Sequence, residues 1–187
     1  MIRIFYLLLP LLFFGCGGES ESSQTQGWHF PGRDCQGCHN TDLASSHRLV
    51  LGGTLFKSGA DAPDSGVCDG SHHMQLLDSS LAVIYDTRND REETDGKLGS
   101  GNLFLLRSER PSISGDYYVR IISKNGVTLS QSSLLHSFTT GYDPDAPESV
   151  QNCYSCNACH STSPKGGASG VLTTSVTTSC VKENYDD

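Results

Sequence analysis

The amino-acid sequence predicts an all-β fold, a small antiparallel β-sandwich, for residues 48–135 of the 187-residue chain. This part contains several short apolar or alternating runs bounded by Gly, Asp, Asn and Ser, which is the pattern of strands and turns. None of it has the 3.6-residue apolar period of a helix. Asn125-Gly126 separates two of the runs and is a strong signal for a tight hairpin. Several short strands joined by regular turns are typical of an antiparallel sandwich.

The expected strands follow one another along this middle part. The hairpin joins YYVRIIS to VTLSQSS, and we expect a type I′ turn because Asn and Gly tolerate the positive φ that this turn needs. Loop-rich segments are expected on both sides of the sandwich, at residues 29–47 and 136–187. The expected strands are Leu49–Phe56, Met74–Leu77, Leu81–Thr87, Leu103–Leu106 and Tyr117–Ser123.

Residues 1–15 have the features of an export signal. A single cation, Arg3, precedes the apolar run Ile4–Phe14. That run is too short for a stable membrane-spanning helix, which needs about 20 residues, but it suits the apolar region of a secretory signal. We therefore expect these residues to be removed during export.

Gly15 and Cys16, which follow the apolar run, resemble the lipobox of bacterial lipoproteins, although Phe13 stands where that family usually has Leu. The resemblance implies cleavage before Cys16, acylation of its thiol and a lipid anchor in the membrane. Because Gly17 comes next and not Asp, it also implies the outer membrane of a Gram-negative cell. The alternative is an ordinary signal peptide with an incidental cysteine. Most of residues 16–28 is polar and low in complexity, as expected of a flexible tether.

The chain is acidic once the signal is removed. Loss of residues 1–15 takes away Arg3 and no acidic residue, which leaves 12 Lys and Arg against 21 Asp and Glu, a formal net charge of −9. This balance argues against nucleic acid as a partner and suits an exported domain that faces solvent. The remaining 172 residues are enough for one domain, or for one core with appendages.

Two copies of C-x-x-C-H flank the predicted sandwich. This is the attachment sequence of c-type haem, in which two thiols bond to the porphyrin and the adjacent histidine ligates the iron from that side. A thioredoxin-like pair needs a βαβ setting, and a zinc ribbon needs its two pairs about 15 to 20 residues apart, so neither alternative fits. Two c-type haems, each with its iron, are the expected cofactors. The six residues are Cys35, Cys38 and His39 in CQGCH, and Cys156, Cys159 and His160 in CNACH.

Three further cysteines, Cys68, Cys153 and Cys180, remain after lipidation and haem attachment. Cys153 begins an overlapping C-x-x-C, but histidine follows only the later pair. Three thiols allow one disulfide and one leftover. We expect Cys153 to pair with Cys180, which would hold the tail beside the second haem, and Cys68 with Cys153 is the alternative. Three reduced thiols are disfavoured in an oxidising compartment.

Three stretches of the middle part, GGTLF, DGKLGSGNLFL and GDYYVRI, resemble the carboxypeptidase regulatory-like family, with its patterns G-x-V, D-x-x-G-x-F and G-x-Y-x-V. The chain departs from the family in the insertion ADAPDSGVCDGSHHMQ and at Lys97–Ser100, which lengthens a turn. The resemblance implies an Ig/transthyretin-like sandwich that acts as a scaffold. A small sandwich flanked by C-x-x-C-H motifs is also similar to exported multihaem proteins of metal-respiring bacteria, which implies that the haems carry the function.

Five other histidines are available for the sixth position on each iron. We expect His47 to ligate the first haem, because a helical turn after His39 would return it to the iron. We expect His136 to ligate the second haem from the end of the last predicted strand. His29 is the main competitor at the first haem, and two adjacent histidines face opposite sides if GSHHMQLL is a strand. The competing candidates are His29, His72, His73 and Met74.

Methionine limits the ligand sets, because Met74 is the only methionine left after the signal is removed. At most one haem can therefore have His/Met ligation, and at least one is bis-His or has an open site. Bis-His ligation lacks the methionine that raises the potential of cytochromes c, so we expect low potentials. Low potentials suit the export of electrons to minerals or to partner cytochromes.

The sequence favours electron transfer over catalysis. We expect an outer-membrane or extracellular dihaem cytochrome, without catalytic residues, that relays electrons between partner redox proteins and an extracellular acceptor. The alternative is a dihaem redox enzyme, peroxidase-like or nitrite-reducing, with one open iron, and the many spare histidines argue against it. Two arrangements stay open: the haems relay electrons within one chain, or they meet those of other subunits in a homo-oligomer or filament.

Overall fold

The computed structural model describes residues 31–41, 43–45, 48–57, 66–68, 70, 72–89, 101–108, 112–149 and 153–180. Strands predominate over helices in these residues, which confirms the all-β class at that level. The expected export signal, Cys16, His29 and His47 lie outside the described residues. Within the described ranges, no helix is long and apolar enough to cross a membrane.

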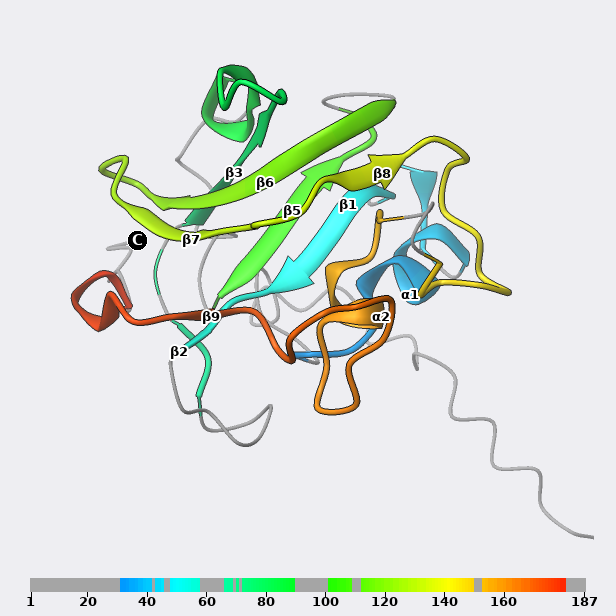
Figure 1. Cartoon of the computed structure of the whole chain (residues 1–187). Coiled ribbons are helices and arrows are strands. Elements are labelled where there is room, and N and C mark those ends of the chain that lie inside the picture. The colour runs from blue at the N-terminus through cyan, green and yellow to red at the C-terminus, as the bar shows by residue number, and fades with distance from the viewer. Residues whose placement is uncertain are drawn as a thin grey trace, which may run out of the picture.

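The larger sheet is antiparallel, with the strand order β4-β3-β6-β7, and Figure 1 labels β3, β6 and β7. β4 (Val83–Asp86) and β3 (His72–Leu77) form one side of it. β6 (Gly115–Ser123) is long enough to pair with β3 and with two later strands, β7 (Thr128–Gln131) and β8 (His136–Phe138). β8 pairs with the first residues of β6, and its first residue, His136, lies opposite Tyr117.

A separate antiparallel pair, β1 (Leu49–Thr54) and β5 (Asn102–Leu106), shares a hydrophobic core with the larger sheet. Two short strands, β2 (Phe56–Lys57) and β9 (Thr173–Thr174), form a parallel pair near the end of β1. The alternating apolar pattern therefore predicted the strands, since each of the five expected runs contains one. The core residues are Val50, Leu51, Leu55, Cys68, Met74, Leu76, Tyr85, Leu103, Leu105, Ile113, Ile121, Leu129, Phe138, Tyr154 and Cys180.

The β6–β7 hairpin is confirmed, but the expected type I′ turn is wrong. Its turn residues are Lys124 and Asn125, and the amide of Gly126 donates to the carbonyl of Ser123 at 2.8 Å. Only Gly126 has a positive φ, of 81°, whereas a type I′ turn needs positive φ at both central residues. The glycine instead follows the turn in the left-handed region, as in a three-residue hairpin loop.

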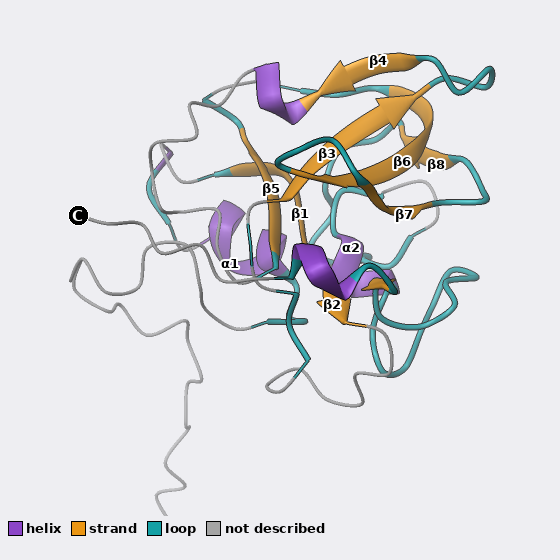
Figure 2. Ribbon diagram, turned by 90° about the vertical axis from the view of Figure 1, so that its left-hand side faces the viewer, coloured by secondary structure: helices purple, strands orange, loops and turns teal. Residues whose placement is uncertain are grey.

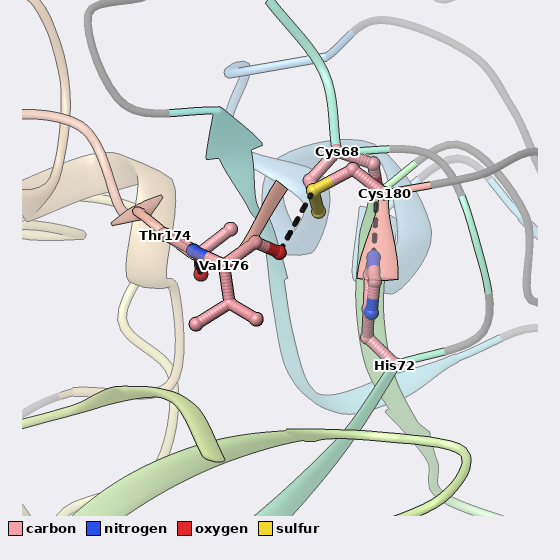
Figure 3. Close-up of a disulfide and its surroundings, with 5 residues drawn as sticks. All are labelled: Cys68, His72, Thr174, Val176 and Cys180. Carbon is pink, nitrogen blue, oxygen red and sulfur yellow. Dashed lines mark hydrogen bonds between the residues drawn. A yellow bond between two sulfur atoms is a disulfide. The ribbon is translucent and has the colours of Figure 1, made fainter. Parts of the chain in front are cut away.

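The disulfide joins Cys68 to Cys180, so the expected pairings of Cys153 with either of them are wrong (Figure 3). The reason lies in the backbone around the β2–β9 pair. The amide of Cys68 donates to Leu55 at 2.9 Å, and the next amide, of Phe56, donates to Leu172 at 2.8 Å. The segments that carry the two cysteines are therefore held against the same stretch of chain. The C-terminal segment is covalently tied to the core.

Each C-x-x-C-H motif begins a short helix. α1 spans Cys35–Thr41 and α2 spans Cys156–Cys159, and they lie on either side of β1 (Figure 2). The described residues also contain the 3-10 helices η2 (Thr87–Asn89), after β4, and η4 (Thr177–Ser179), before Cys180. The two motifs, at opposite ends of the sequence, are thus brought to one strand.

Candidate haem site

The second C-x-x-C-H motif lines a cleft of about 310 Å³ between α2, β8 and the sheets. Cys156, Cys159 and His160 contribute from the motif, and His136 contributes from the start of β8. The volume lies at the lower end of the range of small-molecule sites, and the other walls combine apolar side chains with serine, threonine and glutamine residues. The apolar lining residues include Leu51, Met74, Leu103, Val119, Ile121, Val171 and Leu172.

His136 and His160 face each other in this cleft. Their ring centroids are 6.2 Å apart and their planes differ by 19°. Two imidazoles on opposite sides of one metal ion, with metal–nitrogen bonds of about 2 Å each, have centroids about 6 Å apart. The separation of the two rings therefore meets one requirement for a shared iron.

Backbone carbonyls fix the proton positions on both rings. Nδ1 of His160 donates to the carbonyl of Gly170 at 3.0 Å, and Nδ1 of His136 donates to the carbonyl of Leu134 at 3.1 Å. Because a carbonyl can only accept, Nδ1 carries the proton and Nε2 keeps its lone pair. Metal-ligating histidines are commonly held in this way through the second ring nitrogen.

Burial favours the neutral form of both imidazoles. Desolvation lowers the pKa of His136, the hydrogen bond to Leu134 opposes this shift, and neighbouring His160 adds to it. Desolvation also lowers the pKa of His160, against the opposing hydrogen bond to Gly170. The neutral form is the one that binds a metal, so the site favours the required state.

The described thiols do not have the properties of a thiol-redox centre. Burial raises the pKa of Cys35 and of Cys156 to about 12, and it also raises the pKa of Cys159. Reactive thiols need a lowered pKa, so these observations argue against thioredoxin-like chemistry. Cys38 is disulfide-bonded in the structure. That bond and a thioether to haem exclude each other, because one sulfur cannot form both.

The first motif has fewer described residues around it. Asp34 caps α1, since its Oδ1 accepts from the backbone amide of Gln36 at 3.1 Å, and His39 lies on the same helix. The expected distal ligand, His47, and its competitor, His29, lie outside the described residues.

The other candidate ligands lie on β3. His72 contacts the disulfide region, where its Nε2 is 2.7 Å from the carbonyl of Cys68 (Figure 3). Neither His72 nor His73 lines the described cleft, whereas Met74 does, among its apolar residues. The structure thus brings His136 and Met74, of the candidates it describes, to the second motif.

Two glycines allow both motif helices to approach β1. A methyl group at Gly52 would lie 3.0 Å from Cβ of Cys35, and one at Gly53 would lie 2.6 Å from Cβ of Cys156. Successive residues of a strand face opposite sides, so Gly52 faces α1 and Gly53 faces α2. Any larger side chain at either position would push a motif away from the strand.

Sequence reasoning missed Gly53, Leu134 and Gly170 as parts of the site. A glycine pair in the middle of a strand is the signal that could have identified the first, because glycine in a strand often marks a close approach of another segment. The other two contribute only backbone carbonyls, which no side-chain pattern reports. Comparison of the chain with known family models, curated proteins and solved structures gives no match.

Proposed function

We propose that this chain is an exported electron-transfer protein, a dihaem c-type cytochrome. The observation that carries the proposal is the His136–His160 pair. Both rings are oriented by backbone carbonyls, stand at a separation that meets one requirement for a shared iron, and line a cleft with Cys156 and Cys159. No nucleophile or acid/base pair is needed for such a role.

At the second motif, Cys156 and Cys159 would hold the haem by thioether bonds, with His160 as the proximal ligand and His136 as the distal ligand. The haem supplies a reversible one-electron change at its iron. The apolar part of the lining would cover one portion of the haem surface. Because His136 and His160 would both bind the iron, the proposal leaves no place on it for a substrate, which distinguishes it from the redox-enzyme alternative.

At the first motif, Cys35 and Cys38 would hold the haem, and His39 would be the proximal ligand. His47 is the proposed distal ligand, with His29 as its competitor. Attachment here requires Cys38 to be released from its disulfide, so reduction of that bond must come before thioether formation.

The proposal extends to the architecture and the location. We infer that the β1–β5 pair and the larger sheet form a small Ig/transthyretin-like sandwich, flanked by two haem-binding segments. The support is the core that they share. A lipid anchor at Cys16 would place this body at the outer membrane or cell surface, where other cytochromes or redox proteins would be its partners.

Visible absorption spectra of the purified protein, with a pyridine haemochrome assay, test the function. We expect two covalent haems per chain, both low-spin when reduced, and no carbon monoxide binding. Changing Cys156 and Cys159 to alanine should remove one covalent haem, and changing Cys35 and Cys38 should remove the other.

Two outcomes would contradict the proposal. A chain without covalent haem would exclude a c-type cytochrome. A wild-type protein with one high-spin haem that binds carbon monoxide or peroxide would favour the redox-enzyme alternative, because one axial position would then be open.

A further inference from the structure

The two C-x-x-C-H motifs are joined by a reciprocal pair of hydrogen bonds. Nε2 of Gln36 donates to the carbonyl of Tyr154 at 3.1 Å, and Nδ2 of Asn157 donates to the carbonyl of Arg33 at 2.7 Å. Each donor is the first variable residue of its motif, and each acceptor lies two residues before the other motif. The two contacts are therefore equivalent, although the partners are 118 and 124 residues apart.

A third hydrogen bond lies between these two. The hydroxyl of Ser155 donates to Oδ1 of Asp34 at 2.6 Å, so the residues immediately before the two motifs also contact each other. The other carboxylate oxygen of Asp34 accepts from the hydroxyl of Tyr142 at 2.6 Å. Because Asp34 also caps α1, one carboxylate links the start of the first helix to the second motif.

These polar side chains are buried. Gln36 is 0 % exposed, Ser155 is 1 % exposed and Asn157 is 3 % exposed. Asn157 also accepts from the backbone amide of Thr54 at 3.0 Å and donates to its hydroxyl at 3.1 Å. Loss of one partner would leave a buried polar group without a hydrogen bond, at a cost of about 1–3 kcal/mol, so the interface resists separation.

Each bridging amide lies close in sequence to the histidine proposed to bind the iron of its own motif. His39 lies three residues after Gln36, and His160 lies three residues after Asn157, so each bridging amide and each proximal histidine belong to the same short turn. A shift of either helix would therefore move a proximal ring relative to its haem. The potential of a haem depends on its axial ligand and on the hydrogen bonding around it.

We propose that Gln36 and Asn157 are positioning residues that make the two haem-attachment motifs one unit. A change at either amide alters the haem at the other motif as well as its own. This inference rests on the proposed function and adds to it a coupling between the two haem sites within one chain.

The test uses Gln36→Leu and Asn157→Leu in the full-length haem-bearing protein. A spectroelectrochemical titration should resolve two reduction steps, and His136→Met assigns one of them to the second haem by raising it. We expect Gln36→Leu to shift the step of the second haem as well as the first, and Asn157→Leu to shift the first as well as the second. The low-spin electron paramagnetic resonance signals should change in the same pattern.

Two variants serve as controls, because they remove side-chain hydrogen bonds that stay within one motif segment. Thr41→Ala removes the bond from its hydroxyl to the carbonyl of Gly37, and Ser161→Ala removes the bond to the carbonyl of Ser163. Each control should leave the haem of the opposite motif at its wild-type potential. The inference is overturned if Gln36→Leu leaves the potential of the second haem unchanged. It is also overturned if the control variants shift the potential of the opposite haem as much as the leucine variants do.

A measurement on the wild type covers the case in which the leucine variants do not fold. Amide hydrogen exchange of 36–41 and of 156–160 should proceed through one opening, with equal free energy and equal denaturant dependence. Two separate openings would overturn the inference while leaving the cytochrome proposal intact. Absence of covalent haem from the wild type would overturn the cytochrome proposal instead, so the two failures are distinguishable.

Discussion

His136 and His160 acquire the properties of metal ligands from their backbone neighbours. Partial burial lowers the pKa of both rings and so favours their neutral form, and a carbonyl that accepts from each Nδ1 leaves Nε2 with its lone pair. At the scale of single residues, the carbonyls of Leu134 and Gly170 therefore matter as much as the imidazoles.

Changing His136 to alanine should open one axial position. We expect a high-spin signal from about half of the total haem and a new capacity to bind carbon monoxide, because the other haem keeps both ligands. Ser137→Ala, one residue later on β8, is the control, since a serine hydroxyl is not a candidate iron ligand and that of Ser137 donates to the Thr139 hydroxyl at 3.5 Å. A low-spin haem of raised potential would identify Met74 as a substitute ligand, and an unaltered spectrum would exclude His136 as a ligand.

The carboxylate of Asp86 should control the acid stability of the larger sheet. Burial alone would raise its pKa, but hydrogen bonds from Arg88, at 2.6 Å, and Gln75, at 2.7 Å, outweigh that effect and hold the pKa below its ordinary value of 3.8. The unfolded chain thus binds a proton more readily than the folded chain in acid. Stability from Asp86 is present above about pH 4 and is lost as the pH falls through the lowered pKa.

Denaturant unfolding at several pH values from 7 to 3 measures this effect. Asp86→Asn should lower the free energy of unfolding at pH 7 and should flatten its decrease in acid. Arg88→Met should also flatten the decrease, because it removes the strongest opposing partner and brings the folded-state pKa of Asp86 closer to its unfolded-state value. Equal acid sensitivity in all three proteins would contradict the assignment.

At the scale of elements, the absence of side chains at Gly52 and Gly53 lets both motif helices pack against β1. Gly53→Ala would place Cβ 2.6 Å from Cβ of Cys156, a contact that no side-chain rotation relieves. We expect a loss of about 1–3 kcal/mol in the free energy of unfolding, as in other overpacked sites. The absorption of the second haem should change with it.

Gly37→Ala is the matched control within α1. Its methyl group would lie 3.4 Å from Oδ2 of Asp34, an ordinary contact, and its helical position favours alanine over glycine by up to about 1 kcal/mol. It should therefore leave stability unchanged or raise it. Thermal unfolding of both variants compares them, and equal destabilisation would show that β1 tolerates larger residues at Gly53.

The strands β1 and β3 to β6 could be predicted because each depends on a local apolar pattern, whereas β8 and β9 lie in the segment that was expected to be loop-rich. His136 could also be placed near the second motif, since it follows the last predicted run. The type I′ turn was wrong because the same Asn125-Gly126 pair also fits a turn in which only the glycine has positive φ. The bridging role of Gln36 and Asn157 could not be predicted, because variable positions of a motif carry no pattern and their acceptors are distant in sequence.

At the scale of the whole molecule, the Cys68–Cys180 disulfide closes the chain across 112 residues. Sequence could not select this pair, because the choice among three cysteines depends on which segments meet in space. Replacing both with alanine should lower the free energy of unfolding by about 2–5 kcal/mol, as expected for a loop of this length. The second haem should respond first, because the segment that the disulfide holds includes Gly170, which orients His160.

Denaturant unfolding followed by haem absorption and by far-ultraviolet circular dichroism measures both effects. Cys153→Ser is the control, because its sulfur is not in this disulfide. An unchanged midpoint in the double variant would show that the C-terminal segment is held without the covalent bond.

The long sequence separation between the two motifs also has a consequence for the order of events during biosynthesis. Gln36 is made 118 residues before Tyr154, whose carbonyl it needs, so α1 cannot reach its final position until most of the chain has been synthesised. Contacts this distant form late and slowly, because the entropy of closing the intervening loop opposes them. The first motif therefore stays accessible to covalent modification throughout that interval, whereas the second has only the time between its own emergence and the closure of the fold.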